Sequence, residues 1–339
     1  MTDQAPPAYS GPRRVLSGVQ PSGALHLGNY LGALVKFARL QHEVETFIFV
    51  ADMHAITVWQ DPKLLAGQVR EITAAYLASG LDPKVATIFP QSAVPQHAEL
   101  AWIFNCVARL GWLDRMTQFK EKSAKHADNI NAGLFTYPSL MAADILLYQT
   151  DVVPVGDDQK QHVELCRDVA QRFNNLYPDT FTIPEPIISQ SGARIKSLAE
   201  PTRKMDKSDP NPNAVVYLLD DRDTIIRKFK RAVTDSETSV RYAPGKDGIN
   251  NLMTIYSCFT GKDFAAIEAE FAGRGYSDFK LAVGEVTADA LAPVQAEFRR
   301  LMADKTYIED LMRKGAREAA ICAARTLTKV KKKLGLVLI

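Results

Sequence analysis

The stretch that most constrains this chain is residues 14–29, RVLSGVQPSGALHLGN, in which a short apolar segment runs into a glycine-rich loop and then into a helical pattern. Val15 and Leu16 indicate the end of a buried strand, and helical spacing begins at Leu25. Strand, loop and helix in this order present backbone N–H groups and the positive end of a helix to an anion. No lysine follows the glycines, so the stretch is not a P-loop, and its spacing does not match G-x-G-x-x-G. The pattern therefore predicts a phosphate site of another kind.

The loop and the start of its helix carry four polar side chains, those of Gln20, Ser22, His26 and Asn29. His26 and Asn29 lie three positions apart and share one face of the helix, and Gly28 between them lets a flat ring come close. This arrangement suits ATP. A plain turn between strand and helix, with Ser22 as its cap and His26 at the surface, has the same residues, and this stretch alone does not decide between the two.

Length and composition indicate a globular protein of two domains. The chain has 339 residues, and a hydrophobic share of 46% is enough for a sizeable core. With 41 basic and 39 acidic residues the formal net charge is +2, so a nucleic-acid surface must be a local patch. The cysteines form no C-x-x-C pair, which argues against structural zinc and a disulfide framework and favours reduced thiols in the cytoplasm. They are Cys106, Cys166, Cys258 and Cys322.

Residues 1–13 contain no apolar core of the kind that a signal peptide needs. The sequence also has no run of about 18 apolar residues. We therefore expect a short disordered tail at the N-terminus and no membrane span. We also expect no DNA partner.

The first ninety residues predict a β-α-β-α-β unit. Residues 46–51 (TFIFVA) form an apolar run without alternation, which suits a strand of a parallel sheet covered on both faces. Asp61 and Pro62 open a helix that continues through Ser79, because aspartate is a good N-cap and proline fits the first turn. Residues 85–90 (VATIFP) predict a further strand. The fold class is therefore α/β, with a Rossmann-like parallel sheet.

The middle of the chain predicts a mixture of elements. We expect one amphipathic helix over residues 99–116, followed by a charged segment over 118–125 (QFKEKSAK). A loop around Gly133 leads to residues 137–138, where tyrosine and proline start the helix SLMAADILLY. Residues 152–155 predict a short strand.

The C-terminal part is predicted to be helical. The chain is loop-rich after residue 178, and residues 203–213 (RKMDKSDPNPN) are unsuited to regular structure. We therefore expect an α/β domain over 14–210 and a helical domain over 211–339. Its helices are expected near residues 221–233, 250–260, 263–272, 278–303 and 305–334.

A second marker is Lys204-Met205-Asp206-Lys207-Ser208, in which two lysines lie three apart on a loop. Two ammonium groups there suit a pyrophosphate, although most such loops are only solvated charge clusters. Together with HLGN at 26–29, the loop resembles the HIGH and KMSKS signatures of the class I aminoacyl-tRNA synthetases. The resemblance covers nearly the whole chain and is closest to the bacterial tryptophanyl-tRNA synthetases. Further stretches that carry it are DMHAITVWQDP, RMTQFKEKSA, YPSLMAADILLYQTDVVPVGDDQKQH and GARIKSL.

Two positions depart from these signatures. The middle serine of KMSKS is Asp206, and its negative charge between two lysines is expected to weaken the grip on ATP. The last histidine of HIGH is Asn29, an amide that is usual in this branch of the family.

A third constellation lies in TYPSLMAADILLYQTD, where Tyr137, Met141, Asp144 and Tyr148 recur at helical spacing. A carboxylate among Ala, Ile and Leu costs several kcal/mol if nothing donates to it. One possibility is a structural aspartate satisfied by a backbone N–H or an arginine. The other is a pocket in which Asp144 accepts an indole N–H, the role that the resemblance implies, and such a site rejects phenylalanine strongly.

A fourth constellation is the turn at residues 156–162, GDDQKQH. Asp158 and His162 lie four apart, but with no third ligand evident a helix cap explains them better than a metal. The resemblance implies that residues 156–158 contact the ATP ribose and that Gln159 lies near the amino group of tryptophan.

The resemblance implies a two-step ligase, which forms tryptophanyl-adenylate from L-tryptophan and ATP and then transfers tryptophan to the 3′ end of tRNA(Trp). A carboxylate is already ionised at pH 7, so the first step needs positioning and charge stabilisation but no general base. The resemblance implies Mg²⁺ carried by the nucleotide, and catalytic roles for His26, Lys122, Lys204 and Lys207. The tryptophan contacts that it implies are Asp144, Tyr137, Met141 and Gln159. Its implied ATP site comprises Gln20, Pro21, Ser22, Gly28, Asn29, Gly156, Asp157, Asp158, Arg194, Ile195, Lys204, Met205, Asp206, Lys207 and Ser208.

The resemblance also implies a homodimer, with its interface within residues 99–150, and a helical domain that binds the anticodon. Candidate phosphate contacts there are Arg227, Lys228, Lys230 and Arg231, or residues 329–333, although basic runs at helix ends are more often only solvated. Three rivals stay open: a synthetase for tyrosine or another amino acid, a smaller nucleotidyltransferase, and a synthetase-like protein that only senses tryptophan or RNA.

Overall fold

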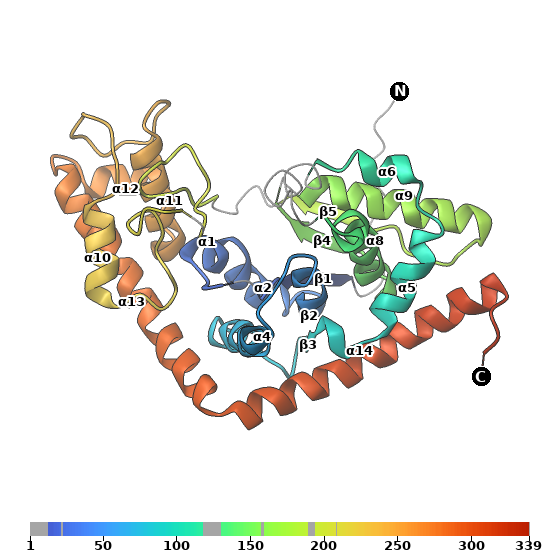
Figure 1. The fold of residues 1–339 in the computed structure, drawn as a ribbon. Coiled ribbons are helices and arrows are strands. Elements are labelled where there is room, and N and C mark those ends of the chain that lie inside the picture. Colours follow the sequence, from blue (N-terminus) through green and yellow to red (C-terminus); the bar gives the residue numbers. More distant parts are fainter. Residues whose placement is uncertain are drawn as a thin grey trace.

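The computed structural model describes residues 13–21, 23–117, 130–156, 159–188, 194–207 and 209–338. At its centre lies a five-stranded sheet in the order β3-β2-β1-β4-β5, in which each neighbouring pair is parallel, so the predicted α/β class is confirmed (Figure 1). The expected N-terminal tail and the charged segment 118–125 lie outside the described residues, except for Arg13. The strands are β1 (Arg14–Val19), β2 (Glu45–Val50), β3 (Thr87–Pro90), β4 (Val152–Val155) and β5 (Glu185–Ile188).

The N-terminal half forms as its sequence predicts. In β2 only Glu45 is exposed and the other five side chains are buried, as expected for a strand covered on both faces. The long helix α4 (Pro62–Ala78) begins at the predicted cap, because the Asp61 carboxylate accepts a hydrogen bond from the Lys63 N–H at 2.9 Å. The shorter elements of this half are α1 (Leu27–Asn29), the π-helical turn η1 (Tyr30–Leu34), α2 (Val35–Leu40), α3 (Asp52–Ala55) and the 3₁₀ turn η2 (Gln91–Ala93).

The helix predicted over residues 99–116 is wrong as a single element. The chain instead forms α5 (Gln96–Asn105) and α6 (Leu110–Asp114), with Arg109 in an extended conformation between them. Apolar side chains of the linking residues pack against the core, and Arg172 donates a hydrogen bond to the carbonyl oxygen of Val107 at 3.0 Å. These contacts stabilise the break.

Two further elements differ from the prediction. The region around Gly133 is not a loop, because α8 (Ala132–Leu147) begins there, with the Asn131 side chain accepting a hydrogen bond from the Leu134 N–H at 2.9 Å. Pro138 therefore lies inside the helix instead of starting it. The segment after residue 178, expected to be loop-rich, contains β5 as an edge strand, a position where Pro186 is tolerated. Between these elements lies α9 (Lys160–Leu176).

The C-terminal helices match the predicted ranges closely: α10 (Arg222–Lys230), α11 (Asp247–Thr260), α12 (Phe264–Glu270), α13 (Tyr276–Ala303) and α14 (Lys305–Leu334). The first three pack with the beginning of α13 around an apolar core that also includes Leu27, Leu31, Ala74 and Ala75 of α1, η1 and α4. The helix α13 then runs past α4, and α14 crosses beneath the sheet (Figure 1). None of the described helices combines the length and apolar character that a membrane span needs.

Gly315 fixes how closely α14 approaches the sheet. A Cβ built on Gly315 would lie 2.8 Å from the carbonyl carbon of Ile88 in β3, and closer still to its oxygen. Only glycine permits this approach. The long C-terminal helix packs on β3, α4, α5 and α8 as well as on α13.

Candidate functional site

The strand order places the candidate site at the edge where β1 and β4 end. From β1 the chain continues to β2 and β3 on one side, then returns to β4 and β5 on the other side. In sheets of this kind, ligands bind outside the carboxyl ends of the two strands where the order reverses. The loops after Val19 and Val155, both predicted to bind ATP, leave the sheet at this point.

His26 is the N-cap of α1 and is 6% exposed. Its Nδ1 accepts a hydrogen bond from the Gly28 N–H at 3.1 Å, and its own backbone N–H donates to Asn29 Oδ1 at 3.1 Å. Because Nδ1 is an acceptor, the ring proton of neutral His26 lies on Nε2. Burial, helped by the charges of Lys204 and Lys207, lowers the pKa of His26 to about 4, against an opposing effect of Asp206. The imidazole is therefore a neutral N–H donor at physiological pH.

The lysine loop folds onto the glycine loop, although 181 residues separate His26 from Lys207. Carbon and nitrogen atoms at the end of the Lys207 side chain lie 3.5 Å from where a Cβ of Gly23 would be, at a positive φ that suits glycine. Burial lowers the pKa of Lys207, and Asp206 opposes this. The two signature segments predicted to act together thus lie side by side.

Backbone contacts hold the lysine loop in this position. Met205 is buried and its N–H donates to the carbonyl oxygen of Ile195 at 3.0 Å. Ile195 in turn lies against Gly28, with its Cβ 3.8 Å from the position a Gly28 Cβ would take. The Leu27 N–H donates to the Val216 carbonyl oxygen at 2.8 Å, which joins α1 to the segment after the loop.

Asp144 of α8 is 1% exposed and lies at the centre of a polar cluster. Oδ2 contacts His54 Nε2 at 2.7 Å. Oδ1 accepts from Gln91 Nε2 at 2.7 Å and lies 2.6 Å from His97 Nδ1. Burial raises the pKa of Asp144, but the charges and hydrogen bonds of His54 and His97 outweigh it and lower that pKa to about 2. The carboxylate is therefore ionised and is purely an acceptor.

Of the other residues predicted to bind tryptophan, Tyr137 lies beside this cluster. Tyr137 is buried, with its ring edge-on to His54 at 6.2 Å and its hydroxyl 2.6 Å from His162 Nε2. Met141 is partly buried against the main core. Gln159 is the N-cap of α9, and its N–H donates to the Gly156 carbonyl oxygen at 2.9 Å.

Comparison with known proteins identifies the family. Residues 9–292 match the family described as tRNA synthetases class I (W and Y). A tryptophan–tRNA ligase of Caulobacter vibrioides is 57% identical over 340 residues, which cover 99% of each chain. The chain belongs to the tryptophanyl-tRNA synthetases, the tryptophan–tRNA ligases of class I.

Solved structures of this synthetase family agree with the fold. The tryptophanyl-tRNA synthetase of Mycoplasma pneumoniae superposes with a TM-score of 0.89 at 37% identity, covering 96% of this chain and 99% of that one. The enzyme of Campylobacter jejuni, complexed with ADP and tryptophan, gives a TM-score of 0.81 at 32% identity, covering 95% of this chain and 100% of that one.

Some site residues escaped the sequence argument, and others cannot be placed. His54, Gln91 and His97 were not predicted, although the need of a buried Asp144 for donors pointed to partners of this kind. The sequence offered backbone N–H or arginine as its partners, and the observed partners are two imidazoles and an amide. Five predicted synthetase site residues lie outside the described residues: Ser22, Lys122, Asp157, Asp158 and Ser208.

Several lysines proposed as tRNA phosphate contacts are engaged within the chain. Lys228 is buried, and its Nζ donates to Val215 O at 2.7 Å and Asp220 Oδ2 at 2.6 Å, so this prediction is wrong. Lys329 and Lys333 donate to backbone carbonyls at residues 178–180. These lysines attach the end of α14 to the α/β domain.

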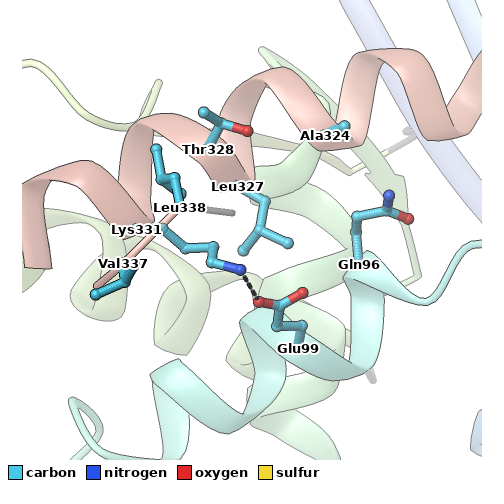
Figure 2. A pocket seen from close by; sticks show the side chains of 8 residues that line it. All are labelled: Gln96, Glu99, Ala324, Leu327, Thr328, Lys331, Val337 and Leu338. Carbon is cyan, nitrogen blue, oxygen red and sulfur yellow. Dashed lines mark ion pairs between the residues drawn. The ribbon is translucent and has the colours of Figure 1, made fainter. Parts of the chain in front are cut away.

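The basic end of α14 is also tied to α5. Figure 2 shows Lys331 reaching to Glu99, an ion pair of 2.8 Å beside a cavity of about 290 Å³. Leu327 and the tail residues Val337 and Leu338 supply apolar walls of this cavity. Arg227, Lys230 and Arg231 stay exposed on the helical region.

Proposed function

We propose that this synthetase activates L-tryptophan with ATP at the carboxyl edge of β1 and β4 and then transfers it to the 3′ end of tRNA(Trp). A carboxylate oxygen of tryptophan attacks the α-phosphorus of ATP, the bond from that phosphorus to the bridging oxygen breaks, and pyrophosphate leaves. A ribose hydroxyl of the tRNA then takes the tryptophanyl group, and AMP leaves. The single observation that carries this proposal is the convergence of Lys207, Gly23 and His26.

In this proposal His26 donates its Nε2–H to the oxygens on which charge develops during attack. The donor is fixed before ATP arrives, because the Gly28 N–H holds Nδ1 as an acceptor. Preorganised donors of this kind stabilise a transition state without reorganisation at the moment of reaction. The remaining contacts to adenine, ribose and phosphates are assigned to Gln20, Pro21, Ser22, Gly28, Asn29, Gly156, Asp157, Asp158, Arg194, Ile195, Met205 and Ser208.

Lys204 and Lys207 hold the departing pyrophosphate, and Lys122 contributes from the segment 118–125. A phosphate-binding lysine has to be charged, and the end of the Lys207 side chain lies beside Gly23 of the glycine loop, where its ammonium group can pair with a phosphate. Asp206 opposes the binding of the triphosphate by its charge.

Tryptophan is recognised in this proposal by Asp144, with Tyr137 and Met141 along the indole ring and Gln159 near the amino group. The supporting fact is that the Asp144 carboxylate is buried and ionised, and that Oδ2 has His54 as a partner and can accept from one more donor. The indole N–H is a donor, whereas a phenyl ring offers none.

Mg²⁺ is proposed to arrive with the nucleotide. Among the described residues no group of three acidic, histidine or cysteine side chains could hold a metal ion. The imidazole and ammonium groups near His26 are poor ligands for Mg²⁺, which prefers oxygens, and phosphates supply these. No step above depends on the ion.

The domains take separate roles in this proposal. Residues 14–210 carry both substrate sites, and residues 211–339 bind the anticodon, with Arg227, Lys230 and Arg231 as its exposed cations. Residues 99–150 form a homodimer interface, supported by the exposed Trp102 and Leu110.

A cytoplasmic location is supported by four cysteines that are all free.

The test is transfer of labelled tryptophan to RNA. With ATP present, the chain should convert tRNA(Trp) to acid-precipitable tryptophanyl-tRNA and leave tRNA(Tyr) uncharged. Equal charging of both RNAs, or charging with tyrosine in place of tryptophan, would overturn the assignment.

A further inference from the structure

We propose that His97 and Tyr148 are positioning residues for tryptophan recognition, which hold the Asp144 carboxylate so that Oδ2 is turned to the indole N–H. This inference rests on the role proposed above for Asp144. Neither residue needs to touch the substrate, because both act through the carboxylate.

In the series of hydrogen bonds Asp144–His97–Tyr148, the carboxylate of Asp144 fixes the direction of the first. Asp144 is an acceptor, so His97 Nδ1, at 2.6 Å, must carry a proton and donate it. The other ring nitrogen, Nε2, lies 2.8 Å from the Tyr148 hydroxyl. Burial together with the charge of Asp144 raises the pKa of Tyr148, so its hydroxyl stays protonated and is a hydrogen-bonding partner for that nitrogen. The His97 ring is thus held between Asp144 on one side and Tyr148 on the other.

Packing leaves these rings no alternative orientation. His97 and Tyr148 are both fully buried, with ring centroids 5.6 Å apart. Phe89 lies 5.8 Å from the Tyr148 ring and 6.1 Å from the His97 ring, and Phe47 lies 4.8 Å from Tyr148. A ring held on this many sides keeps its rotamer.

Gln91 completes the support on the same oxygen. Its side-chain carbonyl accepts from the backbone N–H groups of Met53 at 3.2 Å and His54 at 3.4 Å, so its amide N–H₂ must point at Asp144 Oδ1. Oδ1 thus receives two donors, from Gln91 and His97. Oδ2 receives one, from His54, and retains a lone pair.

The fixed carboxylate makes the site specific for a ligand ring that carries an N–H. The Asp144 carboxylate cannot rotate, so Oδ2 keeps the same orientation whether or not the ligand has an N–H donor. The site therefore favours a ring with an N–H through geometry fixed in the free enzyme, and that preference depends on His97 and Tyr148 as well as on Asp144.

The experiment compares two ligands that differ only at the recognised atom: L-tryptophan and its benzothienyl analogue, in which sulfur replaces the indole N–H. Their dissociation constants are measured by calorimetry for Tyr148→Phe, His97→Leu and His97→Asn. The loss of one hydrogen bond to a charged group corresponds to about a tenfold weaker complex or more. We expect His97→Leu to weaken tryptophan about tenfold and Tyr148→Phe about threefold, with the analogue and the KM for ATP unchanged.

His97→Asn is the rescue, because its amide nitrogen can take the place of Nδ1 and donate to Asp144. It should restore most of the preference for tryptophan. The control is Tyr256→Phe, which removes a tyrosine hydroxyl that bonds Glu270 in the helical region and should leave both ligands unaffected.

Three outcomes separate the possibilities. If Tyr148→Phe and His97→Leu weaken both ligands equally, the residues are merely structural and the proposal is overturned. If Asp144→Ala abolishes the preference for tryptophan but Tyr148→Phe and His97→Leu do not, the positioning role fails and the role of Asp144 stands. If Asp144→Ala leaves the preference intact, the proposed function of Asp144 itself fails.

Discussion

Replacing His26 by asparagine separates the two tasks that the structure gives to this residue. The imidazole caps α1 by accepting from the Gly28 N–H, and its Nε2–H is left to donate toward the phosphates. Asparagine is a good N-cap, so the first task is retained. Its side chain is too short for the second. His26→Asn should therefore preserve the fold and lose activation.

The magnitudes follow from these contacts. Loss of one preorganised donor to a developing oxyanion lowers kcat about 100-fold, which is roughly 2.7 kcal/mol of transition-state stabilisation. The free energy of unfolding of His26→Asn at pH 7 should stay within about 0.5 kcal/mol of wild type. His26→Ala should show the same loss of kcat and a further loss of about 1 kcal/mol in stability, because its cap is gone.

The pH dependence gives an independent test. The pKa of His26 is about 4 in the folded chain and 6.5 in the unfolded chain. The unfolded state therefore binds the proton first, and stability falls as pH decreases from 6.5 to 4. The resulting decrease in the free energy of unfolding is about 3 kcal/mol; it is complete below pH 4 and absent above pH 6.5. His26→Asn removes this decrease, so its unfolding free energy should vary less with pH across that window.

The assays are urea unfolding at pH 4.5 and 7, and ATP–pyrophosphate exchange at saturating tryptophan. In wild type, kcat/KM for ATP should show no inflection from His26 between pH 5 and 8, because the group is already neutral. An exchange rate for His26→Asn within threefold of wild type would refute the role of Nε2–H. A titration of wild-type kcat/KM near pH 6.5 that disappears in the variant would refute the neutral tautomer.

Three further predictions concern the packing of α14 and the lysine loop. Gly315→Ala should destabilise the chain by about 1–2 kcal/mol in urea unfolding, because its Cβ meets the backbone of Ile88. The control is Gly67→Ala, in a helix with open space around it, which should stabilise the chain by about 0.5–1 kcal/mol. Changes of the same sign in the two variants would contradict the packing described. Lys207→Ala should lower kcat for exchange about 100-fold with the tryptophan KM within twofold, and an unaltered kcat would remove Lys207 from catalysis. Asp206→Ser should lower the KM for ATP about two- to fivefold at low salt and less at high salt, and a KM that rises would show that Asp206 assists instead of opposing ATP.

Local signals predicted most of the helices and strands correctly. The start of α4 follows from Asp61 and Pro62, and β2 follows from an uninterrupted apolar run. Each of these depends on residues within one turn or one strand. The break after α5 and the early start of α8 escaped, because the Val107 carbonyl is held by Arg172 from another helix, and the cap at Asn131 competed with the stronger signal of Pro138.

The candidate site was predictable where a signature carried it. Residues 26–29 and 204–207 were expected to converge, and Lys207 does lie against Gly23. The partners of Asp144 were not predictable individually, since His54, Gln91 and His97 come from three separate segments that only the packing of the sheet and α8 brings together. A sequence shows that a buried carboxylate needs donors; the fold decides which residues provide them.

The central claim is that this chain activates tryptophan at the site formed by His26, Lys207 and Asp144. The most direct measurement is ATP–pyrophosphate exchange by the full chain, with each of the natural amino acids offered alone. We expect exchange with tryptophan and at least 1000-fold less exchange with phenylalanine, a discrimination of the order expected when a buried acceptor is left unpaired. We expect no comparable rate with tyrosine. Exchange supported equally well by tyrosine, or no exchange with tryptophan, would contradict this claim.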